Sequence, residues 1–286
     1  MRRRWSPASV GRVLDDAFGL YRAHFRLVVA TALVTVFPVA VIVGLTQAFV
    51  TRGMLALIPE FGTAGGDALE SLLDLQVLSL ASNATAPLFW VARVFLACVL
   101  LHAAGSLYAG RAMGLRDMLS VGWSRALTFA LVTFVLTAGA TILLFFGIVP
   151  GIIFAARFAL APAAVAVEGA GFEGAFRRSW ALTGGHAWRV IGFYVLVSVF
   201  ALVLETTVTS PSVSRQLVAS IGNPEAIFAP VSAWWKTVEG ILSAAAVTLV
   251  IPFAELAWFF FYADLRARRE GMDLVVRAAE LAEARG

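Results

Sequence analysis

Residues 127–167 read LTFALVTFVLTAGATILLFFGIVPGIIFAARFALAPAAVAV and contain one charged side chain, Arg157. An α-helix needs about 20 apolar residues to cross the hydrocarbon core of a bilayer, and this run is long enough for two crossings. Val149-Pro150-Gly151 interrupts it, and proline and glycine are poor residues for continuing a helix. The stretch therefore predicts a tight hairpin of two membrane spans, with a single kinked segment as the alternative.

The whole chain has the composition of a membrane protein. Of its 286 residues, 60% are hydrophobic and 14% are charged, whereas soluble globular chains carry about 25% charged residues. Long apolar runs use up the length, so we expect one membrane domain over residues 1–286 and no separate soluble domain. Six runs qualify as spans: 27–50, 88–109, 127–148, 152–167, 190–208 and 241–262.

Basic residues predict the orientation of these spans, because cytoplasmic loops retain Arg and Lys. Loops 51–87 and 209–240 contain only Arg52, Arg215 and Lys236. Apart from two arginines inside predicted spans, all other basic residues fall on the opposite side of the membrane. We expect an even number of spans with both termini in the cytoplasm. The N-terminal segment has no apolar core directly after its arginines, so it does not read as a secretory signal.

Three segments that precede odd-numbered spans share one apolar spacing. Residues 10–21, 115–126 and 172–183 each place apolar or small residues at i, i+3, i+4, i+7, i+8 and i+11, with Phe18, Trp123 or Trp180 at the same place. This is the stripe of an amphipathic helix that lies flat on a membrane surface. The fold class we expect is an all-α integral membrane protein with three repeats of one surface helix and two spans. The surface helices cover about 7–22, 112–126 and 171–184.

Five ionisable residues lie inside predicted spans: Arg93, His102, Arg157, Glu205 and Glu255. Such groups are costly in lipid and usually face a partner or water. Arg93, Arg157 and Glu205 fall toward the outer side of the membrane, so Arg157 or Arg93 could pair with Glu205. His102 and Glu255 fall toward the cytoplasmic side and could pair with each other. One interpretation is a polar pathway or a site for an anionic headgroup near Arg157. The other is a set of contacts that only fix helix packing.

A second group of arginines lies at the predicted cytoplasmic edge, where it serves topology and contact with headgroups. Arg177 and Arg178 correspond by position to Asp15 and Asp16 in the first repeat, so we hypothesise that these two surface helices meet through their charges. The basic residues expected at this surface are Arg177, Arg178, Arg266, Arg268 and Arg269.

No arrangement typical of catalysis is present in the sequence. His24, His102 and His186 are widely spread and form no metal-binding spacing, and there is no nucleophile elbow or phosphate-binding glycine loop. Cys98 is a single cysteine in an apolar run, so a buried position is expected. We assign no catalytic residue, metal or cofactor.

Four stretches resemble the glycerophosphoryl diester phosphodiesterase membrane-domain family of bacterial integral membrane proteins. They are Ser9–Arg22, Val149–Gly169, Ala175–Trp180 and Tyr262–Leu274. In some members of that family the membrane domain is joined to a cytoplasmic phosphodiesterase barrel. This chain is too short for the barrel and lacks its His-Arg-Gly start. The resemblance implies the membrane module alone, with Arg157 matching the family pattern and no catalytic residue to carry over.

These observations predict a non-catalytic protein of the bacterial inner membrane that organises lipids or partner proteins. A transporter or channel for a lipid-like or small anionic substrate is the first alternative. A membrane enzyme acting on glycerophosphodiesters or phospholipids is the second. The expected partners are membrane lipids and a partner protein, and the scattered arginines do not indicate nucleic acid.

Overall fold

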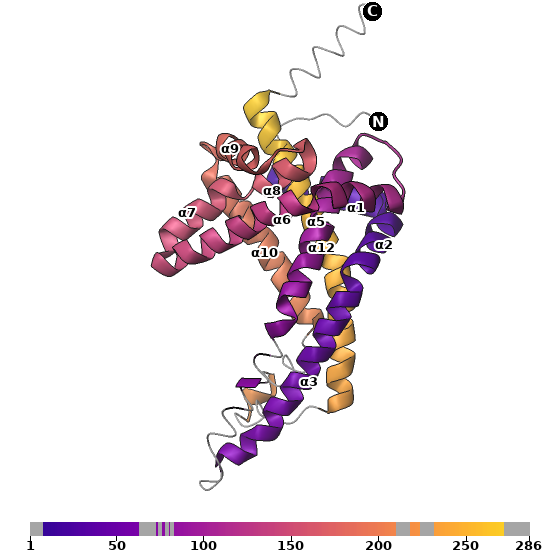
Figure 1. Ribbon diagram of the computed structural model, residues 1–286, viewed down its shortest axis with the longest axis vertical. Helices are drawn as coiled ribbons and strands as arrows, with labels where there is room; N and C mark the ends of the chain where they lie inside the picture. The colour runs from indigo at the N-terminus through magenta and orange to yellow at the C-terminus, as the bar shows by residue number, and fades with distance from the viewer. Residues whose placement is uncertain are drawn as a thin grey trace, which may run out of the picture. The chain divides into compact units, whose positions relative to one another are not determined.

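A computed structural model of the chain describes residues 8–62, 73, 76–77, 80, 83–209, 218–223 and 232–271. Within these residues every regular element is a helix, which confirms the all-α class. Figure 1 labels the α-helices α1 Val10–Ala23, α2 Phe25–Thr35, α3 Phe37–Gly62, α5 Ala86–Tyr108, α6 Leu115–Phe146, α7 Ile148–Phe158, α8 Ala161–Ala163, α9 Phe172–Thr183, α10 Ala187–Thr209 and α12 Ala233–Glu270. The π-helix η1, Ala164–Glu168, directly follows α8.

The chain divides into two compact units. The first contains the described residues of Met1–Thr31, Val94–Val199 and Pro252–Gly286, and the second those of Ala32–Arg93 and Phe200–Ile251. The first unit holds every polar cluster discussed below. That residues 1–286 form one membrane domain stays a prediction.

Several helices are long and apolar enough to cross a membrane. Among the described residues these are Ala86–Tyr108, Leu115–Phe146, Ile148–Glu168 and Thr237–Glu270. A fifth candidate is the pair α1 and α2, which is bent by 84°. Four of the six predicted spans, 88–109, 127–148, 152–167 and 241–262, overlap these four long helices. The other two correspond to shorter apolar helices, Phe37–Val50 and Ala187–Phe200, and to α2.

The first predicted span, 27–50, is divided between two helices. α2 ends at Thr35 and α3 begins at Phe37, with a turn at Val36. Pro38 explains the break, because proline has no N–H for the preceding turn and disfavours a helical conformation in the residue before it.

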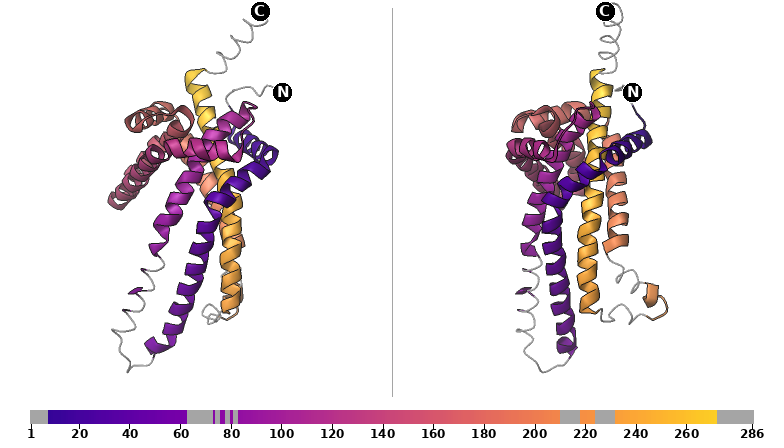
Figure 2. Two further views of the ribbon diagram at one scale, coloured as in Figure 1. Left: turned by 45° about the vertical axis from the view of Figure 1, so that its right-hand side comes forward. Right: turned by 90° about the vertical axis from the view of Figure 1, so that its right-hand side faces the viewer.

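The predicted hairpin is present, but its turn lies earlier than expected. α6 ends at Phe146, Gly147 is extended, and Pro150 and Gly151 lie in the first turn of α7. Proline is tolerated there because the first N–H groups of a helix have no partner within it. A Cβ on Gly151 would lie 2.5 Å from Leu144 Cγ, so glycine lets the two arms pack closely. Both views of Figure 2 show the arms side by side.

Two of the three predicted surface helices are separate helices, α1 and α9. The second, 112–126, is wrong as a separate element, because residues from Leu115 to Phe146 form one continuous helix with no proline to break it. α1 begins after Ser9, whose Oγ accepts the Arg12 N–H at 3.3 Å.

The repeated positions in these segments share one pattern of burial. A buried small residue precedes each repeated aromatic: Ala17 before Phe18, Gly122 before Trp123 and Ser179 before Trp180. The three aromatic side chains are exposed. The small residues of the stripe are therefore buried within the protein, whereas its aromatic residues lie at the surface.

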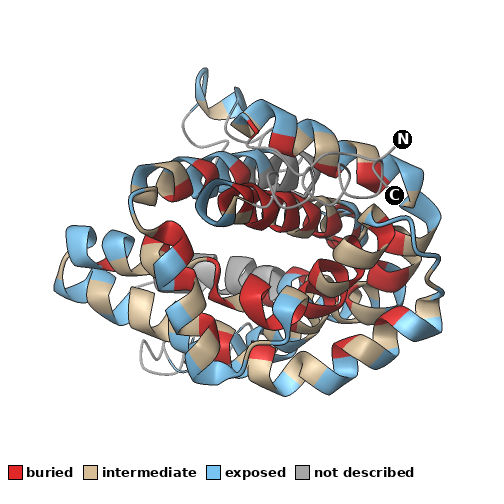
Figure 3. Ribbon diagram, turned by 90° about the horizontal axis from the view of Figure 1, so that it is seen from above, coloured by how far each residue is buried: buried red, intermediate tan, exposed pale blue. Residues whose placement is uncertain are grey.

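The first unit has an aromatic core on the last part of α12. The Phe193 ring of α10 stacks on Phe261 at 4.0 Å with an interplanar angle of 2°, and Phe129, Phe259 and Tyr262 are fully buried. Figure 3 colours the helices by burial and shows buried residues where helices pack together. Such packing fixes the direction of α12, whose next turns carry the polar side chains of the site.

The second unit contains a close contact between two helix backbones. A Cβ on Gly44 of α3 would lie 2.6 Å from the Gly240 carbonyl oxygen of α12. Small residues allow this approach where apolar helices pack without a hydrophobic driving force from water.

Candidate functional site

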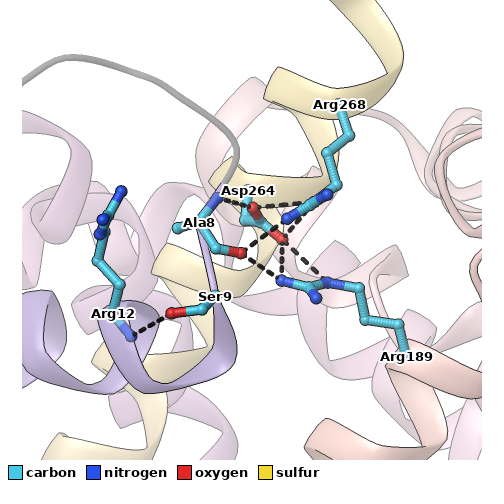
Figure 4. A network of polar contacts seen from close by, with 6 residues as sticks. All are labelled: Ala8, Ser9, Arg12, Arg189, Asp264 and Arg268. Carbon is cyan, nitrogen blue, oxygen red and sulfur yellow. Dashed lines mark hydrogen bonds and ion pairs between the residues drawn. The ribbon is translucent and has the colours of Figure 1, made fainter.

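Asp264 joins three segments that are far apart in the sequence (Figure 4). Its Oδ1 accepts the Ala8 N–H at 2.7 Å, and its Oδ2 accepts Arg189 at 2.8 Å. Arg268, one turn along α12, contacts both carboxylate oxygens at 3.1 Å. Both arginines also donate to the Ala8 carbonyl, at 2.6 and 2.7 Å. We call these four residues the clasp.

The carboxylate at the centre of the clasp is buried and is paired with two arginines. The Asp264 side chain is 1% exposed, whereas those of Arg189 and Arg268 are 24% and 28% exposed. A carboxylate at this burial requires paired charges and hydrogen bonds, because desolvation would otherwise exceed the Coulombic gain. The clasp therefore secures the start of α1 and of α10 to α12, and it leaves no free carboxylate for chemistry.

A second polar cluster joins η1, α9 and α12. The Arg178 guanidinium donates to both oxygens of Glu168, with its Nε at 2.9 Å from Oε2, and also pairs with Glu270. Arg266 lies 3.2 Å from Glu168 and 3.1 Å from Glu270, and the Tyr262 hydroxyl donates to Glu168. We call these five residues the α9 bridge.

Charge pairing outweighs desolvation in the α9 bridge. Burial alone would lower the pKa of Arg178, but its hydrogen bonds to Glu168 and Glu270 raise that pKa above its ordinary value. Bidentate pairs of this kind are geometrically specific. The α9 bridge thus holds the surface helix α9 in one position against the end of α12.

The π-helix η1 presents backbone carbonyls to a third cluster. Arg125 of α6 donates to the Ala166 carbonyl at 2.6 Å, and its Nη1 lies 3.2 Å from His102 Nδ1 of α5. His102 Nδ1 lies 3.0 Å from the same carbonyl. Gly169 ends η1 at φ 71°, a left-handed conformation that favours glycine. π-Helical turns are frequent at functional sites.

Arg157 stands apart from these clusters, because its guanidinium stacks on an aromatic ring. Its guanidinium carbon lies 4.6 Å from the centre of the Trp180 ring. Among the residues that the structure describes, no carboxylate pairs with Arg157. The Trp180 side chain is exposed, and its ring adjoins Phe158 at 5.7 Å. A cation stacked on an exposed indole is suited to bind an anion at the membrane surface.

The backbone of Arg157 is held by α9. Its carbonyl accepts Ser179 Oγ at 2.8 Å and Thr183 Oγ1 at 3.1 Å. Ser179 Oγ also accepts the Leu160 N–H at 3.2 Å. These hydroxyls satisfy the backbone groups freed where α7 gives way to α8. The two residues that fit the apolar stripe of α9 least well are therefore the ones that fix Arg157.

A comparison with known proteins gives one match. Residues 22–262 match the family model described as Domain of unknown function (DUF7847). The chain belongs to the DUF7847 family. No curated protein and no solved structure matches it. The matched range contains Arg157, Trp180 and the whole cluster of Arg125, His102 and Ala166. Ala8, Asp264 and Arg268 of the clasp and Arg266 and Glu270 of the α9 bridge lie beyond it.

In this DUF7847 chain the structure describes the surroundings of four of the five intramembrane candidates. Arg157 stacks on Trp180 and His102 contacts Arg125, while Arg93 is exposed. The side chain of Glu205 lies outside the described residues, so its predicted pairing with Arg157 or Arg93 is untested. Glu255 is partly buried on α12, and its pairing with His102 stays a prediction.

The five predicted basic surface residues have different surroundings. Arg178 and Arg266 belong to the α9 bridge and Arg268 to the clasp, whereas Arg269 donates to the Gly184 carbonyl. Arg177 remains 77% exposed beside Glu173 at 3.7 Å.

The hypothesis that α1 and α9 meet through Asp15-Asp16 and Arg177-Arg178 is wrong. Both arginines find their carboxylates elsewhere within the described residues, because Glu168, Glu173 and Glu270 lie closer to them.

Sequence reasoning missed several residues that build these clusters. They are Arg125, Arg189 and Asp264, together with the hydroxyl residues Ser179 and Thr183. The signal that could have revealed Ser179 and Thr183 is a pair of hydroxyls four residues apart on an otherwise apolar helix face, since buried hydroxyls require acceptors.

Proposed function

We propose that this chain is a non-catalytic module of the bacterial inner membrane that holds anionic lipid headgroups on its cytoplasmic side. The observation that carries the proposal is the Arg157 guanidinium stacked on exposed Trp180, with no carboxylate partner among the described residues. A phosphate oxygen would provide an acceptor for the arginine, and an indole is favoured at the headgroup level. Trp180 belongs to α9, a helix predicted at the cytoplasmic surface, so the proposal sets Arg157 on that side and not toward the outer side.

The surroundings of Arg157 support a preformed site. The Ser179 and Thr183 hydroxyls hold the backbone of Arg157, and the α9 bridge fixes α9, the helix that carries Trp180. Neither the hydroxyl contacts nor the α9 bridge depends on a ligand, so lipid binding would require little rearrangement of the protein. The Arg157 side chain is partly buried, which suits a cation that reaches lipid headgroups while its stem packs against apolar residues.

The proposed topology has six apolar segments in the membrane and both termini in the cytoplasm, in three repeats of a surface helix and two segments. The arginine distribution supports this orientation. The helices that are long enough to cross a membrane support the segments. A relationship to the glycerophosphoryl diester phosphodiesterase membrane-domain family is part of the proposal, and it rests on the sequence stretches alone.

The test is the lipid that purifies with the protein. Wild type, Arg157→Ala and Arg177→Ala would be purified in mild detergent, and their bound phospholipids extracted and quantified by headgroup class. Arg177 is the matched control because it is a more exposed arginine on the helix that carries Trp180. We expect Arg157→Ala to lose bound anionic lipid and Arg177→Ala to keep it. Equal loss in both variants, or no loss in Arg157→Ala, would contradict the proposal.

A second candidate function is transport of a lipid-like or small anionic substrate. One observation favours it: the segment 148–168 is divided into α7, α8 and a π-helix, and Ala166 presents its carbonyl to Arg125 and His102. Interrupted helices with exposed carbonyls occur at transporter sites. Flipping of a fluorescent anionic phospholipid by protein in vesicles, abolished by Arg125→Ala, would favour this function. Binding without flipping would favour the first.

A further inference from the structure

α6, the first arm of the α6–α7 hairpin, is far more exposed than α5. Of the most apolar 18-residue stretch of α6, 11% is buried, against 50% for α5. At its tip, Phe145 is 88% exposed, Phe146 78%, Ile148 70% and Val149 67%. An apolar surface of this extent marks a membrane or protein contact.

The chemistry of the hairpin points to acyl chains. From Leu127 to Ala156 there is no charged side chain and no histidine, so the hairpin offers no polar rim that a protein interface would use. The first charges on either side of this stretch are Arg125 and Arg157 at its base, next to Trp123 and Trp180 in the sequence or in space. Arginine and tryptophan at the base with apolar residues beyond is the pattern of a headgroup boundary.

The hairpin does not run along the helices that cross the membrane. Figures 1 and 2 show α6 and α7 lying across the direction of α5 and of the end of α12, all within the first unit. If α5 and α12 cross the bilayer along their axes, a hairpin set across them stays at one side. The hairpin is long enough to cross the bilayer, but its direction would keep it at one side.

Close packing at the base fixes this direction. A Cβ on Gly122 of α6 would lie 2.1 Å from Val99 Cγ2 of α5, so the two helices cross at this glycine. Arg125 is anchored to the Ala166 carbonyl, and the α7 backbone is anchored to Ser179. Rotating the hairpin into line with α5 would break all three contacts.

We propose that the α6–α7 hairpin is a wedge in the cytoplasmic leaflet, with its tip among acyl chains and not at the periplasmic face. The proposal depends on the membrane insertion assumed above, but not on lipid binding at Arg157. Both ends of a wedge lie on one side, as do both ends of a pair of spans, so the even topology is unchanged. A wedge adds apolar volume to one leaflet only.

The test uses single cysteines at the tip. In a Cys98→Ala background, which removes the buried native thiol, Phe146→Cys and Ile148→Cys would each be treated with a membrane-impermeant maleimide from either side. The same variants, labelled with a fluorophore in detergent, would be placed in vesicles that contain nitroxide-bearing acyl chains. We expect no maleimide labelling from either side and strong quenching by the nitroxide lipids.

Two control positions separate this proposal from the assumption of insertion. Ala219→Cys, in the loop 209–240 expected outside, should react from the periplasmic side. Val199→Cys, an exposed α10 position, should be quenched but not labelled. If the controls behave so and Phe146→Cys reacts from the periplasm, the hairpin is a pair of spans and the wedge is refuted. If Phe146→Cys is neither quenched nor labelled but cross-links between copies, a second chain covers the hairpin and the wedge is likewise refuted. Failure of Val199→Cys to be quenched would instead refute membrane insertion itself.

Discussion

The carboxylate of Asp264 accepts the backbone N–H of Ala8 at 2.7 Å, across 256 positions in the sequence. Arg189 and Arg268 complete this clasp on the same carboxylate. The contact brings the beginning of the described chain to the end of α12, and it puts a negative charge with 1% exposure at the meeting point of three segments. Its stability effect is therefore open to a direct test.

Asp264→Asn should destabilise the protein by about 3 kcal/mol, because two guanidinium groups would lose their counter-charge. The lower end of the range for buried pairs is expected since both arginines reach solvent. Thermal unfolding in detergent is the measurement, with Asp15→Asn as control. Asp15 is exposed, so a change within about 0.5 kcal/mol is expected there. Equal effects at the two positions would show that the clasp contributes nothing specific.

Ser179→Ala should destabilise the protein by about 1–3 kcal/mol. The substitution leaves the Leu160 N–H and one bond of the Arg157 carbonyl unsatisfied at a fully buried position. Ser124→Ala is the matched control, because the exposed Ser124 hydroxyl bonds only to Val121 of its own helix. Thermal unfolding of both variants decides the point. A Ser179→Ala protein as stable as the control would mean that the break between α7 and α8 needs no support from α9.

Two glycine substitutions should have opposite signs. Gly169→Ala should destabilise by about 1 kcal/mol, because its φ of 71° is unfavourable for alanine and a Cβ there would lie 3.3 Å from Arg125. Gly174→Ala should stabilise by about 0.5–1 kcal/mol, because Gly174 lies inside α9 and a Cβ there meets only Ala170 Cβ at 3.9 Å. Unfolding temperatures that move in the same direction would argue against the geometry of η1 and α9.

Reporter fusions test the orientation. Alkaline phosphatase or a cytoplasmic reporter fused after residues 60, 120, 180 and 225 should report outside, inside, inside and outside. The physical reason is retention of arginine on the cytoplasmic side. A periplasmic signal after residue 180 would place Arg157 and Trp180 near the wrong face, and the headgroup proposal would then need the opposite leaflet.

The sequence was sufficient for the helical class and for most apolar segments, because absence of charge over some 20 residues is a one-dimensional signal. The hairpin was also predictable, but its turn was assigned to Pro150-Gly151 when Gly147 makes it. Proline alone does not say whether it ends one helix or begins the next.

The polar clusters were not predictable, because their members are far apart along the chain. No local pattern distinguishes Asp264, which is buried with two arginines, from Asp15, which is exposed. That Arg157 lies at a site for an anionic headgroup stays a proposal. The stacking of Arg157 on Trp180 depends on how α9 folds back onto α7, and that is a tertiary contact.

The most direct measurement of the central proposal is the affinity of the purified protein for phosphatidylglycerol, determined by native mass spectrometry for wild type, Arg157→Ala, Trp180→Ala and Arg177→Ala. One arginine near a membrane surface contributes about 1 kcal/mol to binding of an anionic lipid, which is roughly fivefold in Kd. We predict a roughly fivefold weaker Kd for Arg157→Ala, a smaller loss for Trp180→Ala and no change for Arg177→Ala, with phosphatidylethanolamine unaffected throughout. An Arg157→Ala protein that binds phosphatidylglycerol as tightly as wild type would contradict the proposal.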